Sequence, residues 1–116
     1  MTGLINSRGI TVRQGNSFAI IMRFKLPDRD LDISGMKLQM CVRDEQDNLI
    51  LDKAGAVSDA VHGTAVIELT PQDTDLPLGQ YKTDIKATFA DGQVHTIYPQ
   101  NINAVAYFKV TEEVGK

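Results

Sequence analysis

The chain has 116 residues, of which 42% are hydrophobic and 23% are charged, and its formal net charge is −3. This composition is typical of one globular domain. It lacks the clustered basic excess of a nucleic-acid surface, and no window approaches the roughly 20 apolar residues of a membrane-spanning helix. We therefore expect one domain over residues 1–116, with a core at about 9–111 and short flexible termini, that binds neither nucleic acid nor membrane.

The start of the chain and its cysteine content indicate the compartment. Met1 to Leu4 lacks the basic start and apolar core of a secretory signal peptide. Cys41 is the only cysteine, so no internal disulfide can form, which fits a reducing compartment. We expect the protein to be made in a cytoplasm.

Alternation of apolar and polar residues, which is typical of β-strands, dominates the first half of the chain. Residues 9–13 predict a short strand, and residues 17–26 (SFAIIMRFKL) predict a long one. Residues 27–30 have the composition of a turn. Residues 36–43 alternate again, and a short strand at 49–52 follows a polar turn.

The segment after the predicted strand 64–70 contains a helix-start signal. Thr70 can serve as N-cap and Pro71 as the first helical residue, and Asp73 can complete an approximate capping box. Only one short helical turn, near 71–75, fits before Pro77.

Residues 76–97 predict a corner followed by a hairpin. Tyr81 begins a strand directly after the corner, and we expect its hydroxyl to bond backbone in the loop 73–76. Asp91-Gly92 favours a two-residue hairpin turn. That turn length predicts three cross-strand pairs: Phe89 with Val94, Ala87 with Thr96, and Ile85 with Tyr98.

Seven to nine short strands with about one helical turn predict an all-β, antiparallel β-sandwich. We expect that truncating Phe24 or Phe89 to alanine destabilises the fold by about 3–5 kcal/mol. The predicted core comprises Phe18, Ile20, Met22, Phe24, Leu38, Met40, Val42, Ile67, Leu69, Ile85 and Phe89.

The last predicted strand, 104–111, is apolar on both faces, with Val105 and Tyr107 on one of them. An open strand of this kind invites aggregation, so it lies inside the sandwich or at an interface. We expect one face to pack inward and the other to meet a partner, with Ile97 and Tyr98 nearby. The alternative is that the monomer covers both faces.

No residue cluster indicates catalysis, a cofactor or a resident metal. His62, His95 and Cys41 lack the short spacings of a zinc site, and Cys41 lies in mid-strand without an adjacent base. The spacing Asp28-x-Asp30-x-Asp32 suggests calcium, but it lacks the glycine and glutamate of an EF-hand loop. A calcium site between loops stays open beside a solvated acidic turn.

Several short motifs together resemble a known family. They comprise Gly15-x-Ser17-Phe18, Ile33-Ser34-Gly35, Arg43-Asp44, Leu76-Pro77-x-Gly79-x-Tyr81-x-x-Asp84, and Asp91-Gly92 with Thr96-Ile97. With them the chain resembles the immunoglobulin-like β-sandwich module of tail and baseplate proteins of bacteriophages and prophages, in particular the N-terminal domain of phage upper baseplate proteins. The resemblance spans about residues 9–111 and departs from the family at 98–103, before the last strand.

The resemblance implies a non-enzymatic structural component of a virion, made in the bacterial cytoplasm. Its expected partners are other phage structural proteins or further copies of itself. The alternative is a ligand-binding module of the carbohydrate or adhesion type. Carbohydrate binders usually present exposed planar aromatics, and this chain has no tryptophan, which favours the structural role.

Overall fold

The computed structural model describes residues 3–6, 9–99 and 105–112, and these residues form an all-β fold without a helix. Among them there is accordingly no helix that could cross a membrane. The strands are β1 (Gly3–Asn6), β2 (Gly9–Arg13), β3 (Phe18–Arg23), β4 (Lys25–Leu26), β5 (Arg29–Asp30), β6 (Lys37–Arg43), β7 (Leu49–Ala54), β8 (Ala56–Asp59), β9 (Thr64–Leu69), β10 (Gly79–Thr88), β11 (Val94–Tyr98) and β12 (Ala106–Thr111).

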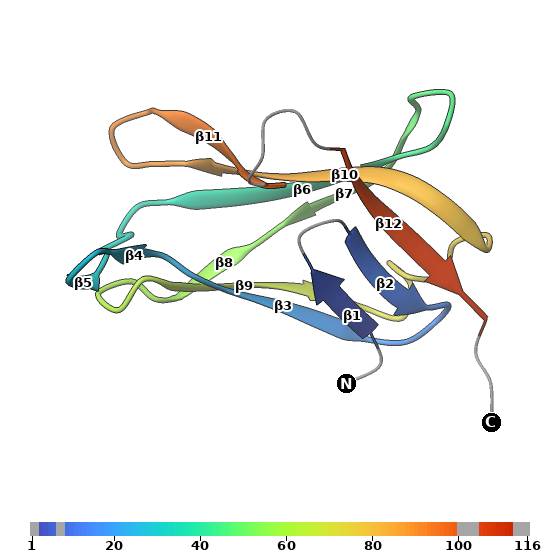
Figure 1. The fold of residues 1–116 in the computed structure, drawn as a ribbon, viewed down its shortest axis with the longest axis horizontal. Coiled ribbons are helices and arrows are strands. Elements are labelled where there is room, and N and C mark those ends of the chain that lie inside the picture. Colours follow the sequence, from blue (N-terminus) through green and yellow to red (C-terminus); the bar gives the residue numbers. More distant parts are fainter. Residues whose placement is uncertain (1–2, 7–8, 100–104, 113–116) are drawn as a thin grey trace.

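Two sheets form the two layers in Figure 1, and β4 and β5 make a separate small hairpin. The large sheet has the order β1-β2-β12-β10-β6-β7, and β11 pairs with β10 beyond the end of β12. The small sheet has the order β3-β9-β8. This arrangement is consistent with a β-sandwich-like fold.

One strand pair differs from the predicted antiparallel arrangement. β12 runs parallel to β2, while all other ladders are antiparallel. Parallel neighbours need a long connection, and nearly the whole domain lies between these two strands. The sheet is therefore mixed.

The described residues form twelve strand segments, more than the predicted seven to nine. One reason is Gly55, which separates β7 in the large sheet from β8 in the small sheet. A side chain at Gly55 would meet Leu38 and Ile67 at 3.0 and 2.8 Å. The chain therefore passes between the sheets where no side chain fits.

The inner faces of the two sheets form the core. Eight of the predicted core residues are buried, whereas Met22, Phe24 and Phe89 are only half-buried against it. These three lie near one end of the sandwich, where the core thins. Buried hydrophobic residues that were not in the predicted core are Ile10, Val12, Ile33, Met36, Ala65, Ala87, Ala106, Phe108 and Val110.

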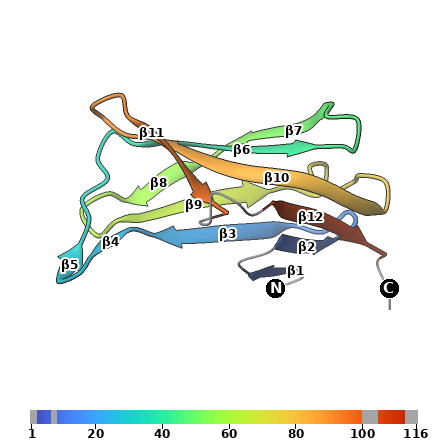
Figure 2. The same ribbon diagram turned by 45° about the horizontal axis from the view of Figure 1, so that its top comes forward.

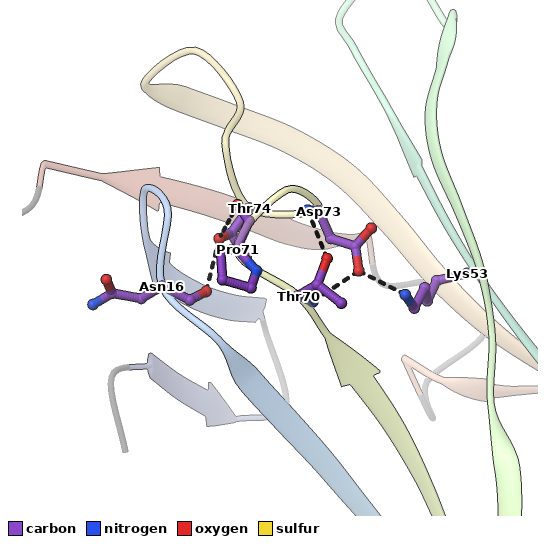
Figure 3. A network of polar contacts seen from close by, with 6 residues as sticks. All are labelled: Asn16, Lys53, Thr70, Pro71, Asp73 and Thr74. Carbon is purple, nitrogen blue, oxygen red and sulfur yellow. Dashed lines mark hydrogen bonds and ion pairs between the residues drawn. The ribbon is translucent and has the colours of Figure 1, made fainter.

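The turn after β9 has the predicted capping box but no helix (Figure 3). The Thr70 N–H donates to the Asp73 carboxylate at 2.8 Å, and the Asp73 N–H donates to the Thr70 hydroxyl at 3.2 Å. One bond from Thr74 N–H to the Thr70 carbonyl closes a single turn. The buried Thr74 hydroxyl then donates to the Asn16 carbonyl at 2.7 Å, which anchors the turn to the loop before β3.

The predicted tyrosine corner is present at the start of β10. The Tyr81 hydroxyl donates to the carbonyl of Pro77 at 2.7 Å, one residue beyond the predicted loop 73–76. This bond fixes the chain where it crosses from the small sheet to the large one.

The hairpin between β10 and β11 has a three-residue turn, so the predicted register is wrong near the turn. Phe89 N–H donates to the Gln93 carbonyl at 2.8 Å, and Gly92 has a φ of 90°. Such a turn uses the same Asp-Gly pair with the glycine as a bulge residue. Ala87 consequently faces His95 instead of Thr96, and a bulge next to Ile85 restores its predicted pairing with Tyr98.

Candidate functional site

The predicted partner surface includes Tyr107 on the outer side of β12 and Val105, which directly precedes this strand. Val105 is 54% and Tyr107 is 41% exposed, whereas Ala106, Phe108 and Val110 on the other side are buried. One face of this strand therefore packs inward, as predicted. The other face is open in the described chain.

Ile97 and Tyr98, the other two predicted residues, lie half-buried against the core. Burial raises the pKa of the Tyr98 hydroxyl. The bulge in the hairpin leaves Ile97 outside the regular ladder. Two of the four predicted residues line hollows in two regions: Val105 lines one and Ile97 lines another, and Thr96 lines both.

The first region is a hollow of about 480 Å³ on the outer face of the large sheet. Side chains from β6, β10 and β11 meet there with the segment that enters β12. Its lining comprises Cys41, Arg43, Asp47, Lys82, Thr83, Asp84, Thr96, Pro99, Val105 and Ala106.

The same outer face carries more cations than carboxylates, although the chain as a whole is acidic. Strand alternation places Asp52 and Asp84 here, in one row with Cys41. None of the cations forms an ion pair within the described residues. They are Arg13, Lys37, Arg43, Lys82, Lys86 and Lys109. Sequence reasoning missed this grouping because its members come from four strands.

Cys41 is poorly suited to nucleophilic chemistry. Burial, together with the nearby carboxylates of Asp52 and Asp84, raises the pKa of the thiol. Its Sγ donates to Asp52 Oδ1 at 3.8 Å. Since the thiolate is the reactive form, this environment disfavours nucleophilic reaction at the cysteine.

The two histidines lie apart from Cys41. His62 Nδ1 is 2.9 Å from the Asp59 carboxylate, and this contact raises the pKa of His62 and lowers that of Asp59. His95 lies edge-on to the Phe89 ring, with the ring centroids 5.6 Å apart.

In the acidic turn at Asp28, Asp30 and Asp32, the carboxylate of Asp32 forms local hydrogen bonds. Asp32 accepts hydrogen bonds from the hydroxyl and the N–H of Ser34 at 2.6 and 2.9 Å, which lower its pKa. In the described ranges, no three His, Cys, Asp or Glu side chains are grouped so that they could hold a metal ion.

The second region is a lateral hollow of about 430 Å³ between the two sheets. It lies where the end of β3 faces β11. Its lining comprises Met22, Arg23, Phe24, Lys25, Thr96 and Ile97. Half-buried core residues are therefore accessible from one side of the sandwich.

In comparisons with known proteins, no family model and no curated protein sequence matches this chain.

Proposed function

We propose that the protein is an immunoglobulin-like structural module of a bacteriophage or prophage particle, in the tail or baseplate, which acts by protein–protein contact and without catalysis. The observation that carries the proposal is the position of the family motifs. Most of their residues lie at a turn, a corner or the start or end of a strand, while Asp84 lies within β10 and Thr96-Ile97 within β11. Turns, corners and strand ends are the positions at which a sandwich module needs particular residues.

The strand order supports the immunoglobulin-like topology. If β3, β9 and β8 are strands B, E and D, then β12, β10, β6 and β7 are G, F, C and C′. β2 beside β12 then takes the place of the first strand. The tyrosine corner at Tyr81 lies at the start of F, where this fold usually has it.

The contact surface that fits this role is the outer face of the large sheet around Val105 and Tyr107. An aromatic and an aliphatic side chain lie there beside unpaired cations and a shallow hollow. Interfaces commonly combine an apolar centre with a polar rim. The partner would be another structural protein of the same particle.

The test is deletion of the gene in the strain that carries it, followed by electron microscopy and mass spectrometry of induced particles. We expect the protein in wild-type particles, and incomplete tails or baseplates without it. Complementation with Tyr107→Lys should fail, while complementation with Val61→Lys, a change at an exposed turn residue away from this surface, should succeed. Normal particles that lack the protein would contradict the proposal. Binding on a glycan array, lost with Tyr107→Ala, would establish the carbohydrate-binding alternative.

A further inference from the structure

β3 is an edge strand of the small sheet, and Figure 2 shows β9 running along it. Within the described residues its only ladder partner is β9, and that ladder has no register shift. The other edge strands of the two sheets are β1, β7, β8 and β11. Of these, β7, β8 and β11 each have an irregularity in their ladder. Bulges and irregularities protect sheet edges from pairing, and β3 lacks this protection.

The backbone groups of β3 that do not pair with β9 can be assigned, because hydrogen-bonded and non-hydrogen-bonded positions alternate along the strand. Phe24 N–H donates to the Gly63 carbonyl at 2.8 Å and continues the β3–β9 ladder. Hydrogen-bonded positions alternate along an antiparallel strand. Ala19, Ile21 and Arg23 therefore direct their N–H and C=O groups away from β9, toward the free edge.

The side chains of these three residues lie on the outer face of the small sheet. Ile21 is 65% exposed and pairs with Val66, which pairs in turn with Ala56 on β8. This cross-strand row is apolar and ends at the free edge. In the next row, Ala19 pairs with Glu68.

We propose that a second copy of this chain pairs with β3 through this edge, antiparallel and about a two-fold axis at Ile21. Ile21 then lies opposite Ile21 of the second copy, and Ala19 lies opposite Arg23 of the second copy. Every outward N–H and C=O of the three residues finds a partner in this register. The two small sheets become one continuous sheet, a self-complementary interface of the kind that closed dimers use.

Charge complementarity favours a second copy over an unrelated strand. Arg23 of the second copy faces Ala19, and its long side chain extends across this small residue to Glu68. Neither Arg23 nor Glu68 forms an ion pair within the described residues. The two-fold axis generates this charge pair twice, while the apolar rows meet at Ile21. This inference is independent of the proposed particle, because it needs no other protein.

Disulfide trapping tests the register. Hydrogen-bonded antiparallel pairs place Cα atoms about 5.5 Å apart, which suits a disulfide. In a Cys41→Ser background, Ile21→Cys should form a disulfide-linked dimer under mild oxidation. Ala19→Cys should not, because the two copies of position 19 are roughly 13 Å apart along the strands. Failure of Ile21→Cys to cross-link, or equal cross-linking of both variants, would overturn the proposal.

Sedimentation velocity over a concentration series tests association without oxidation. We expect the wild type to dimerise only at high concentration, because the interface is small. Ile21→Lys should be monomeric, since like charges would meet on the axis, while Val61→Lys, equally exposed but in a turn, should dimerise like the wild type. Arg23→Glu and Glu68→Lys should each weaken dimerisation about tenfold, and the double variant should restore it. A wild type that stays monomeric at millimolar concentration, or a dimer that Ile21→Lys leaves intact, excludes this interface.

Discussion

The ammonium group of Lys53 on β7 lies 2.7 Å from the carboxylate of Asp73 in the turn after β9 (Figure 3). The same carboxylate accepts the Thr70 N–H of the capping box. Asp73 therefore connects the edge of the large sheet to the corner that follows the small one. Sequence reasoning identified the capping box but not the lysine, which lies 20 residues earlier.

Asp73→Asn should lower the free energy of unfolding at pH 7 by about 1–2 kcal/mol. Burial by itself would raise the pKa of Asp73, but hydrogen bonds from Lys53 and Thr70 outweigh it and lower the pKa. Because the pKa of Asp73 is lower in the folded state, its ionised carboxylate stabilises the fold at pH values above the unfolded-state pKa of about 3.9. This stabilisation is lost as the pH falls through the folded-state pKa. Urea unfolding of both proteins should therefore give a difference that shrinks below about pH 4. A difference that stays constant down to pH 2 would contradict this assignment.

Tyr81→Phe should lower the free energy of unfolding by about 0.5–1.5 kcal/mol. The change removes only the hydroxyl that donates to Pro77. Tyr107→Phe is the matched control, because Tyr107 is exposed and its hydroxyl has no bond within the described chain. Urea denaturation should show an effect for the first variant alone.

Gly63→Ala should be far more damaging than Gly92→Ala, although both glycines have a positive φ of 69° and 90°. A Cβ at Gly92 meets open space, so only backbone strain of about 1 kcal/mol is expected. A Cβ at Gly63 would lie 2.6 Å from the Leu31 carbonyl oxygen, and we expect a loss of about 3 kcal/mol. Equal melting temperatures for the two variants would show that the loop at Gly63 moves aside.

Phe108→Ala should destabilise the fold by about 3–5 kcal/mol, because the side chain is fully buried between the sheets. Phe89→Ala should have less than half this effect. Phe89 is half-buried, so the larger loss predicted from the sequence for this residue is revised downward. Chemical denaturation of the two variants side by side tests the order.

Calcium should leave the melting temperature unchanged, and so should a chelator. No three His, Cys, Asp or Glu side chains of the described residues are grouped so that they could hold a metal ion, and Asp32 Oδ1 already accepts two hydrogen bonds from Ser34. Scanning calorimetry with millimolar calcium is the measurement. A rise of several degrees that Asp28→Asn abolishes would show that the turn binds calcium after all.

Local patterns predicted the parts of the fold that depend on local chemistry. Alternation identified the inward set Leu38, Met40 and Val42, because one face of β6 is buried and the other is open. The capping box and the tyrosine corner were predictable since their partners lie within four residues.

Features that depend on distant strands could not be predicted in the same way. Asp-Gly serves two- and three-residue turns alike, so the sequence did not distinguish His95 from Thr96 as the neighbour of Ala87. The parallel position of β12 beside β2, and the row formed by Cys41, Asp52 and Asp84, join segments that are remote along the chain. Of the candidate surface, Val105 and Tyr107 followed from alternation, while the bulge at Ile97 did not.

The position of β12 between β2 and β10 has a consequence for synthesis on the ribosome. β2 is made early, but its partner is translated only after residue 105. Until β12 is made, β10 has an open edge over residues 79–83. The inner face of β2 then lacks the complete core against which it packs. We therefore expect the domain to complete its fold only after β12 is made, and slowly, since its pairing is non-local. A nascent chain stopped before β12 would be a substrate for chaperones and proteases.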